Sequence, residues 1–266
     1  MIAITRPDEA DHIAVDIHDQ QLSSAEWLAY FRYNQQHLLP LPWTCPYRLS
    51  EPEKAAIASS IRTFQLGESS EGCHLLRAAR HEAERSGDFT YIDALKLFIK
   101  EEQRHAANLG QFMEQQKINL AEQQWTDTLF RKLRRLVNLE LAIVVLLSAE
   151  LIATVYYQAL QTATASPLLQ QICTQILQDE AMHVVFQSSQ LGRLRQSRCQ
   201  HYCTLTQWLH GGLYGAILLI IWLEHGSVFR AGGYSLADFW EKAWAAWFRA
   251  FRIIKDIAQS SPAITD

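Results

Sequence analysis

The sequence predicts an all-α protein, and three observations carry that prediction. The 266 residues are 48% apolar and 20% charged, with 11 glycines and 7 prolines, so long stretches contain no turn-forming residue. This composition favours long helices over many short strands joined by tight turns. Apolar side chains recur at alternating steps of three and four along four segments, which is the spacing of a helical-bundle core. Capping residues and glycines mark the ends of these segments.

The expected helices are bounded by recognisable start and stop signals. A Pro-rich stretch after the first helix ends it, and Ser50-Glu51-Pro52-Glu53 reads as a capping box that opens the next. Gly87 stops that helix, Asp88 caps the following one, and Ser166-Pro167 opens the fourth core helix, which ends near Gly192. The expected ranges are about 23–37, 51–86, 88–119, 126–162, 166–192, 201–224 and 235–259.

These elements fit one domain covering residues 1–266. Residues 1–50 form an N-terminal extension, and residues 51–195 form a four-helix bundle. Residues 196–266 supply two additional helices packed on that bundle. No solenoid repeat or low-complexity linker divides the chain.

Charge and cysteine usage exclude several classes of protein. A formal net charge of −4 and a pI near 6.2 give no electrostatic basis for binding nucleic acid. The N-terminal segment has early acidic residues and no apolar signal region. Five cysteines without a Cys-x-x-Cys pair indicate reduced thiols and a cytoplasmic protein. Cys199, His201 and Cys203 lie close together but match no recognised metal site, so surface or packing roles are expected.

The strongest apolar run is Leu213–Leu223, bounded by Gly211-Gly212 and Glu224-His225. Eleven residues are too few to span a hydrocarbon core, which needs about 20. We therefore expect no transmembrane span and a buried core helix at this position. An interfacial helix, or one that forms a homodimer, is the alternative.

Six residues with metal-binding side chains interrupt the four apolar stripes near their middles. In the second and fourth stripes a histidine follows a glutamate by three residues, so both side chains lie on one helix face. The six are Glu68 in the first stripe, Glu102 and His105 in the second, Glu150 in the third, and Glu180 and His183 in the fourth.

Four carboxylates converging inside a bundle would repel one another, and each would be costly to bury. Two divalent cations would balance their charge if both imidazoles stay neutral. Carboxylate and imidazole ligands together suit iron or manganese. One Glu from each of two helices and Glu-x-x-His from each of the other two is the pattern of a carboxylate-bridged dimetal site. The alternative is that these polar residues occur in the stripes by chance and are neutralised by salt bridges. That would require Lys or Arg in the same stripes, which contain neither.

The strings EEQRHA around His105 and DEAMH ending at His183, together with Glu68 and Glu150, resemble the ligand set of the ferritin-like diiron carboxylate superfamily. They are similar to those of soluble acyl-carrier-protein desaturases and related diiron oxygenases. The resemblance covers about residues 50–195 and implies a ferritin-like bundle. It implies two Fe ions as cofactors, with Mn or a mixed Mn/Fe pair as alternatives, and O2 as co-substrate.

The resemblance also implies a role for each side chain. Glu102 and Glu180 are expected to bridge the ions, and Glu68 and Glu150 to be terminal ligands. Each histidine is expected to hold one ion. All six would be both metal ligands and the catalytic set.

Residues beside the ligands are expected to support them. Related oxygenases place an acid before each motif glutamate, so we predict that Asp179 accepts a hydrogen bond from His105 and that Glu101 accepts one from His183. The alternative is that both acids face solvent. Tyr157, two turns beyond Glu150, is either a redox-active or hydrogen-bonding group or a core tyrosine.

The resulting functional hypothesis is an O2-activating diiron oxidase or oxygenase that acts on a small or lipid-like organic substrate and receives electrons from an unidentified donor. A first alternative is a ferroxidase, an iron-handling protein or a peroxide-removing protein. A second alternative is a membrane-surface quinone or lipid hydroxylase. Because neighbouring helices of a bundle run antiparallel, we expect Phe64, Phe98, Ala153 and Tyr157 to divide between the two ends of the site. An organic substrate also needs a cavity beside the metals.

Overall fold

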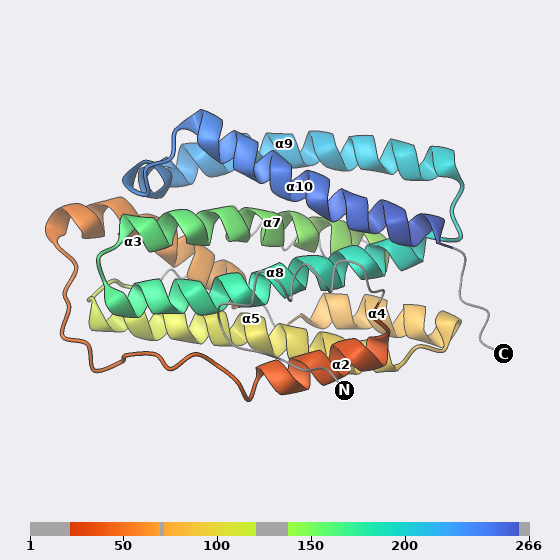
Figure 1. Cartoon of the computed structure of the whole chain (residues 1–266), viewed down its shortest axis with the longest axis horizontal. Coiled ribbons are helices and arrows are strands. Elements are labelled where there is room, and N and C mark those ends of the chain that lie inside the picture. Colours follow the sequence, from red (N-terminus) through yellow and green to blue (C-terminus); the bar gives the residue numbers. More distant parts are fainter. Residues whose placement is uncertain (1–21, 70–71, 121–137, 261–266) are drawn as a thin grey trace.

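The computed structural model describes residues 22–69, 72–120 and 138–260. Within these ranges the regular structure is entirely helical, with no strand, which confirms the all-α prediction (Figure 1). The helices are α2 (Ser24–Asn34), α3 (Glu51–Glu68), α4 (Cys73–Ser86), α5 (Thr90–Gln115), α7 (Leu139–Ala163), α8 (Pro167–Arg195), α9 (Gln200–Ala231) and α10 (Leu236–Gln259).

Helices α3, α5, α7 and α8 form the four-helix core. Side-chain contacts give their directions. Glu101 meets His183 and His105 meets Asp179, so α5 and α8 are antiparallel. The pairs α3–α5 and α7–α8 are also antiparallel, and α5 and α7 lie diagonally opposite and run in the same direction. Neighbouring helices therefore alternate in direction, as predicted.

The expected helix over 51–86 is wrong as a single element, because the chain breaks after Glu68. Gly72 adopts a left-handed backbone with φ of 64° and is the N-cap of α4. A side chain at Gly72 would also meet the Ile99 side chain at 2.3 Å. The string Gly67-Glu68-Ser69-Ser70-Glu71-Gly72 is rich in turn residues, and this signal was available in the sequence. Glu68 is therefore the last residue of its helix.

The other predicted boundaries hold to within a few residues, apart from two cases. The first part of the predicted third core helix, residues 126–137, lies outside the described residues. Helix α9 extends to Ala231 and not only to about 224. Capping boxes are present at Ser50, as predicted, and also at Ser23 and Ser235.

The N-terminal helix α2 covers the bundle on the α5 side. Its Trp27 and Phe31 are buried, and each ring lies 5.2 Å from that of Phe186 on α8. Asn34, at the C-terminal end of α2, reaches the middle of the bundle at the level of the predicted ligands. The N-terminal extension is thus part of the site's surroundings.

Helices α9 and α10 form an additional layer on the bundle (Figure 1). His210 of α9 is hydrogen-bonded to Ser148 of α7, and His225 is hydrogen-bonded to Ser60 of α3. Helix α10 packs on α8, where Gly192 lies against Ile257. Both helices therefore bury one face against the core.

The expectation that Leu213–Leu223 is simply a buried core segment is wrong. Ile217, Leu218 and Ile221 are buried, but Leu219 is 52% exposed and Leu223 is 83% exposed. By length and composition α7 and α9 are both apolar enough to cross a membrane, and within those apolar windows 83% of α7 and 39% of α9 is buried. Helix α7 is accounted for as the core helix of the bundle, whereas α9 keeps an apolar face exposed.

Candidate metal centre

The four core helices bring all six predicted ligands together. One group whose ligand atoms all lie within 4.8 Å of one another contains Glu68, Glu102, His105 and Glu180. A second group within the same limit contains Glu102, Glu150, Glu180 and His183. Glu102 and Glu180 belong to both groups, and each histidine belongs to one. The geometry therefore contains two adjacent sites that share two carboxylates.

The inner atoms of this cluster have no ordinary partners. Among the described residues, buried atoms without a hydrogen-bond partner include Nδ1 of both histidines and carboxylate oxygens of Glu102, Glu150 and Glu180. The side chain of Glu102 is 14% exposed, and those of Glu150, Glu180 and both histidines are almost fully buried. Buried polar atoms in proteins are normally paired. Unpaired atoms that all face one another indicate that something else binds them.

The outer nitrogens of the histidines are fully paired. Nε2 of His105 lies 2.8 Å from Asp179 Oδ2, and Nε2 of His183 lies 3.0 Å from Glu101 Oε2. Both hydrogen bonds are those predicted from the sequence, and both acids are buried and do not face solvent. A carboxylate that accepts from Nε2–H leaves the Nδ1 lone pair directed into the cluster. This tautomer is the one a metal ligand needs.

Three residues that the sequence did not single out hold these outer acids in place. The side-chain amide of Asn34 donates to Glu101 at 2.7 Å and to Asp179 at 2.8 Å. Arg104 donates to Asp179 at 2.7 Å, and Gln175 donates to the same carboxylate at 3.0 Å. Arg104 lies within the Glu102–His105 motif and Gln175 lies one helical turn before Asp179, but Asn34 comes from a distant segment and carries no sequence signal.

We expect Asn34→Ala to weaken metal binding without abolishing it. The variant removes the one amide that links Glu101 to Asp179, so both histidines lose orientation at once. Loss of such an outer partner typically lowers metal affinity 10- to 100-fold. Titration with Mn²⁺ followed by calorimetry measures this change. Asn34→Asp places a third negative charge beside two carboxylates and is expected to be worse than Asn34→Ala; equal affinity for all three proteins would contradict the assignment.

Burial and mutual repulsion dominate the electrostatics of the inner carboxylates. Burial raises the pKa of Glu180 well above its ordinary value, and the charge of Glu150 raises it further. Burial and the charge of Glu102 have the same effect on the pKa of Glu68. The pKa of Glu102 is also raised by burial and by Glu150. In the absence of metal, protons are the only cations that relieve this repulsion directly.

Neighbouring polar groups reverse the effect of burial at three other groups. Burial alone would raise the pKa of Glu150, but the adjacent Glu180 and His183 bring it below its ordinary value. Burial would lower the pKa of His183, but the surrounding carboxylates, Glu101 first, raise it well above the ordinary value. The pKa of Asp179 is lowered despite burial because His105 donates to it.

The donor set fits two divalent cations. Four inner carboxylates carry a charge of −4 when ionised, and among the described residues none of them forms an ion pair with Lys or Arg. Arg104 instead pairs with the outer acid Asp179 and lies 3.8 Å from Glu101. Oxygen and imidazole ligands without thiolate suit iron or manganese. The unpaired inner atoms and the oriented histidines form a cluster that could hold metal ions.

Aromatic rings lie at both ends of the cluster. Phe64 lies 5.8 Å from Tyr157 on one side, and Tyr157 donates a 2.7 Å hydrogen bond to Glu68 Oε1. On the other side the ring of Phe98 lies 4.6 Å from that of His183. The predicted division of these aromatic residues between two ends is therefore present. Tyr157 is a buried hydrogen-bonding group and not merely a packed core tyrosine.

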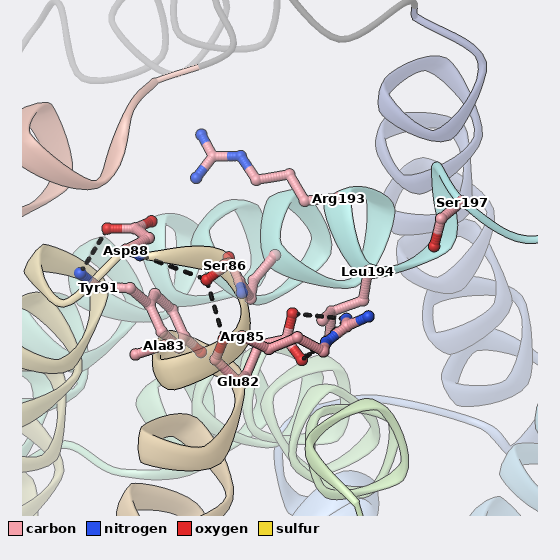
Figure 2. A pocket seen from close by; sticks show the side chains of 10 residues that line it. Glu82, Ala83, Arg85, Ser86, Asp88, Tyr91, Arg193, Leu194 and Ser197 are labelled. Atoms are coloured by element: carbon pink, nitrogen blue, oxygen red, sulfur yellow. Dashed lines mark hydrogen bonds and ion pairs between the residues drawn. The ribbon is translucent and has the colours of Figure 1, made fainter.

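A cavity of about 150 Å³ lies away from the cluster (Figure 2). It is formed where α4 ends, α5 begins and α8 passes, with Glu82, Asp88, Tyr91 and Arg193 among its lining residues. Charges of both signs meet there, and Arg85 is already paired with Glu82. This cavity therefore does not supply the substrate space beside the metals that an organic substrate requires.

Comparisons of the chain with protein-family models, with curated proteins and with solved structures found no significant match.

Proposed function

We propose that this chain is a dinuclear, metal-dependent oxidoreductase that uses O2 to oxidise a small or lipid-like organic substrate. The observation that carries the proposal is the set of unpaired Nδ1 and carboxylate atoms that face one another inside the bundle. Glu68 and His105 would hold one ion, Glu150 and His183 the other, and Glu102 and Glu180 both. Two bound iron ions, or manganese in their place, would supply the electrons for reducing O2.

The remaining residues have roles that follow from their contacts. Asp179 and Glu101 keep the histidine Nε2 atoms protonated and fix the ring orientations. Tyr157 holds one oxygen of Glu68, which ends a helix and therefore has fewer backbone constraints than the other ligands. Phe64 and Phe98 keep the ends of the site apolar and exclude water, which strengthens the electrostatic interactions inside.

A second function, iron oxidation or peroxide removal, is favoured by one specific observation. Rings lie at both ends of the cluster, and the cavity between α4, α5 and α8 lies elsewhere. Glu102 is the ligand with the largest exposed fraction, 14% of its side chain, and an ion needs less space to reach it than an organic molecule does. Turnover with excess Fe²⁺ and O2 separates the two functions. Oxidation that stops at two ions per chain supports an organic substrate, whereas continued oxidation supports iron as the substrate.

Metal content tests both versions of the proposal. Protein reconstituted with Fe²⁺ without oxygen and then desalted is expected to contain about two iron ions per chain, because the geometry has two sites with shared ligands. Elemental analysis against protein concentration gives this ratio. A value near zero after careful reconstitution with Fe²⁺ and with Mn²⁺ would show that the cluster is not a dimetal centre.

A further inference from the structure

Helix α9 presents an apolar face that no described part of the chain covers. Six residues on it form what we call the α9 stripe: Leu205, Leu209, Gly212, Ala216, Leu219 and Leu223. All six are exposed, and the four leucines have exposed fractions of 59%, 65%, 52% and 83% in chain order. A contiguous apolar patch of this kind on a protein surface marks an interaction site.

The spacing of the α9 stripe is that of a helix-pairing seam. Its members follow one another at steps of four, three, four, three and four, which are the a and d positions of a heptad pattern. From residue 199 to residue 223 the chain contains no Asp, Glu, Lys or Arg. The opposite face of the same helix is occupied by the bundle, where His210, Tyr214 and Leu218 are buried. The stripe therefore faces away from its own domain.

The order of residues in the stripe reads the same in both directions. Leucines stand at both ends and small residues stand at the centre, and the pattern is symmetric about residue 214. A two-fold symmetric contact requires that if residue i meets residue j of a second copy, j also meets i. Antiparallel pairing about residue 214 meets this requirement in three layers: Leu205 with Leu223, Leu209 with Leu219, and Gly212 with Ala216.

The centre of the stripe is open enough for a second helix. A side chain built at Gly212 would meet no atom within 4 Å, whereas Gly211 and Gly215 on the flank are already covered by Trp247 and Trp244. Small residues at a crossing point let two helix backbones approach closely, and the leucines on either side then interdigitate. The small and large residues are thus placed where an antiparallel pair needs them.

The exposed area also matches a stable dimer. The stripe is flanked on the same helix by Trp208 at 77% exposed and Leu213 at 37%. If a fully exposed residue of this size presents roughly 200 Å², the four leucines and these two residues together present about 750 Å², close to the roughly 800 Å² that each partner buries in a standard interface.

We propose that α9 pairs antiparallel with α9 of a second copy of this chain, which gives a two-fold symmetric homodimer whose axis passes between the two helices at the level of residue 214. The contact uses the face of α9 opposite the bundle. It leaves the candidate metal centre, on the far side of α7, intact in each subunit. The proposal does not depend on the proposed function, because the stripe contains none of the metal-site residues.

Sedimentation velocity of the full chain without detergent tests the proposal. At tens of micromolar the natural protein is expected to sediment as a species of twice 30.5 kDa. Leu209→Glu combined with Leu219→Glu is expected to be monomeric at every concentration, because antiparallel pairing sets these two charges against each other. Leu38→Glu combined with Phe89→Glu is the matched control: these exposed apolar residues lie outside the stripe, so that variant should remain dimeric. Circular dichroism establishes that all three are folded.

Cysteine cross-linking tests the direction of pairing. Leu209→Cys and Leu219→Cys are made separately in a background lacking the four less-buried cysteines, Cys45, Cys73, Cys199 and Cys203. Mixing the two variants and oxidising them is expected to give a disulfide-linked dimer, whereas neither variant alone should cross-link, since identical positions lie about 15 Å apart along the pair. Cross-linking of Leu209→Cys with itself would indicate a parallel pair and would overturn the proposal.

Three further outcomes would also overturn it. One is a monomeric natural protein at 100 µM. Another is a dimer that survives Leu209→Glu with Leu219→Glu, because a different face would then form the contact. The last is a monomer that floats with phosphatidylcholine vesicles through the stripe, which would assign this face to a lipid surface.

Discussion

Glu180→Ala is expected to reduce the metal content from about two ions per chain to near zero. Glu180 belongs to both four-residue groups of the cluster, so its removal takes a shared carboxylate from both ions. His105→Ala and His183→Ala each remove a ligand from one group only, and each should retain about one ion. Elemental analysis of the natural protein and the three variants, reconstituted side by side, gives the number of metal ions per chain in each.

The matched control is Glu241→Ala, which removes an exposed glutamate of α10 far from the cluster. It should retain two ions. The melting temperature of the metal-free proteins distinguishes misfolding from loss of a ligand. Because Glu180→Ala removes one of four repelling carboxylates, its metal-free melting temperature should not fall below that of the metal-free natural protein. A Glu180→Ala variant that keeps one ion would show that Glu180 is a terminal ligand and would contradict the shared-ligand assignment.

Removing the metals is expected to destabilise the protein strongly at neutral pH and much less in acid. At a free metal concentration about 1,000 times Kd, each ion adds about 4 kcal/mol to the free energy of unfolding. Two ions then correspond to a difference in melting temperature on the order of 20 °C at neutral pH. Differential scanning calorimetry with and without a chelator, at pH 5 and pH 8, measures this difference.

The sign of the pH effect follows from the raised pKa values. In metal-free protein Glu68, Glu102 and Glu180 keep protons that the unfolded chain has already released, so the free energy of unfolding falls as pH rises from the ordinary carboxyl pKa through the raised values. His183, whose pKa is also raised, adds stability below its ordinary pKa of 6.5 that is lost as pH rises through the raised value. Metal-free protein should therefore be more stable at pH 5 than at pH 8.

Metal-bound protein should show the opposite trend over the same range. Metals replace the protons, and acid protonates the ligands and releases the ions. The gap between the two forms should thus narrow on acidification. Glu150 and Asp179 have lowered pKa values, so the stability that they contribute is lost only when the pH falls below the ordinary carboxyl pKa. They therefore do not affect the comparison between pH 5 and pH 8. A melting temperature that chelation leaves unchanged at pH 8 would show that these side chains do not form a repelling buried cluster.

The candidate site was largely predictable because its signal is periodic. Glu68, Glu102, Glu150 and Glu180 interrupt apolar stripes, and helical periodicity alone places them on inward faces. The outer pairs, Asp179 with His105 and Glu101 with His183, followed from the resemblance to diiron oxygenases, which place an acid before each motif glutamate. Asn34 could not be predicted, because a polar residue near a helix end has many ordinary uses and its contacts come from packing between distant segments.

The sequence by itself determined the helical class, most helix ends, and the inward placement of six ligands, because each depends on capping chemistry or on the 3.6-residue period of one helix. The tertiary structure decided the rest. It places Gly72, whose left-handed backbone begins α4, against the side chain of Ile99 of α5. It joins both histidines through Asn34, and it turns one apolar face of α9 outward although the run Leu213–Leu223 is apolar on every side. Periodicity fixes which residues share a face, whereas which face is covered depends on what the rest of the chain packs against it.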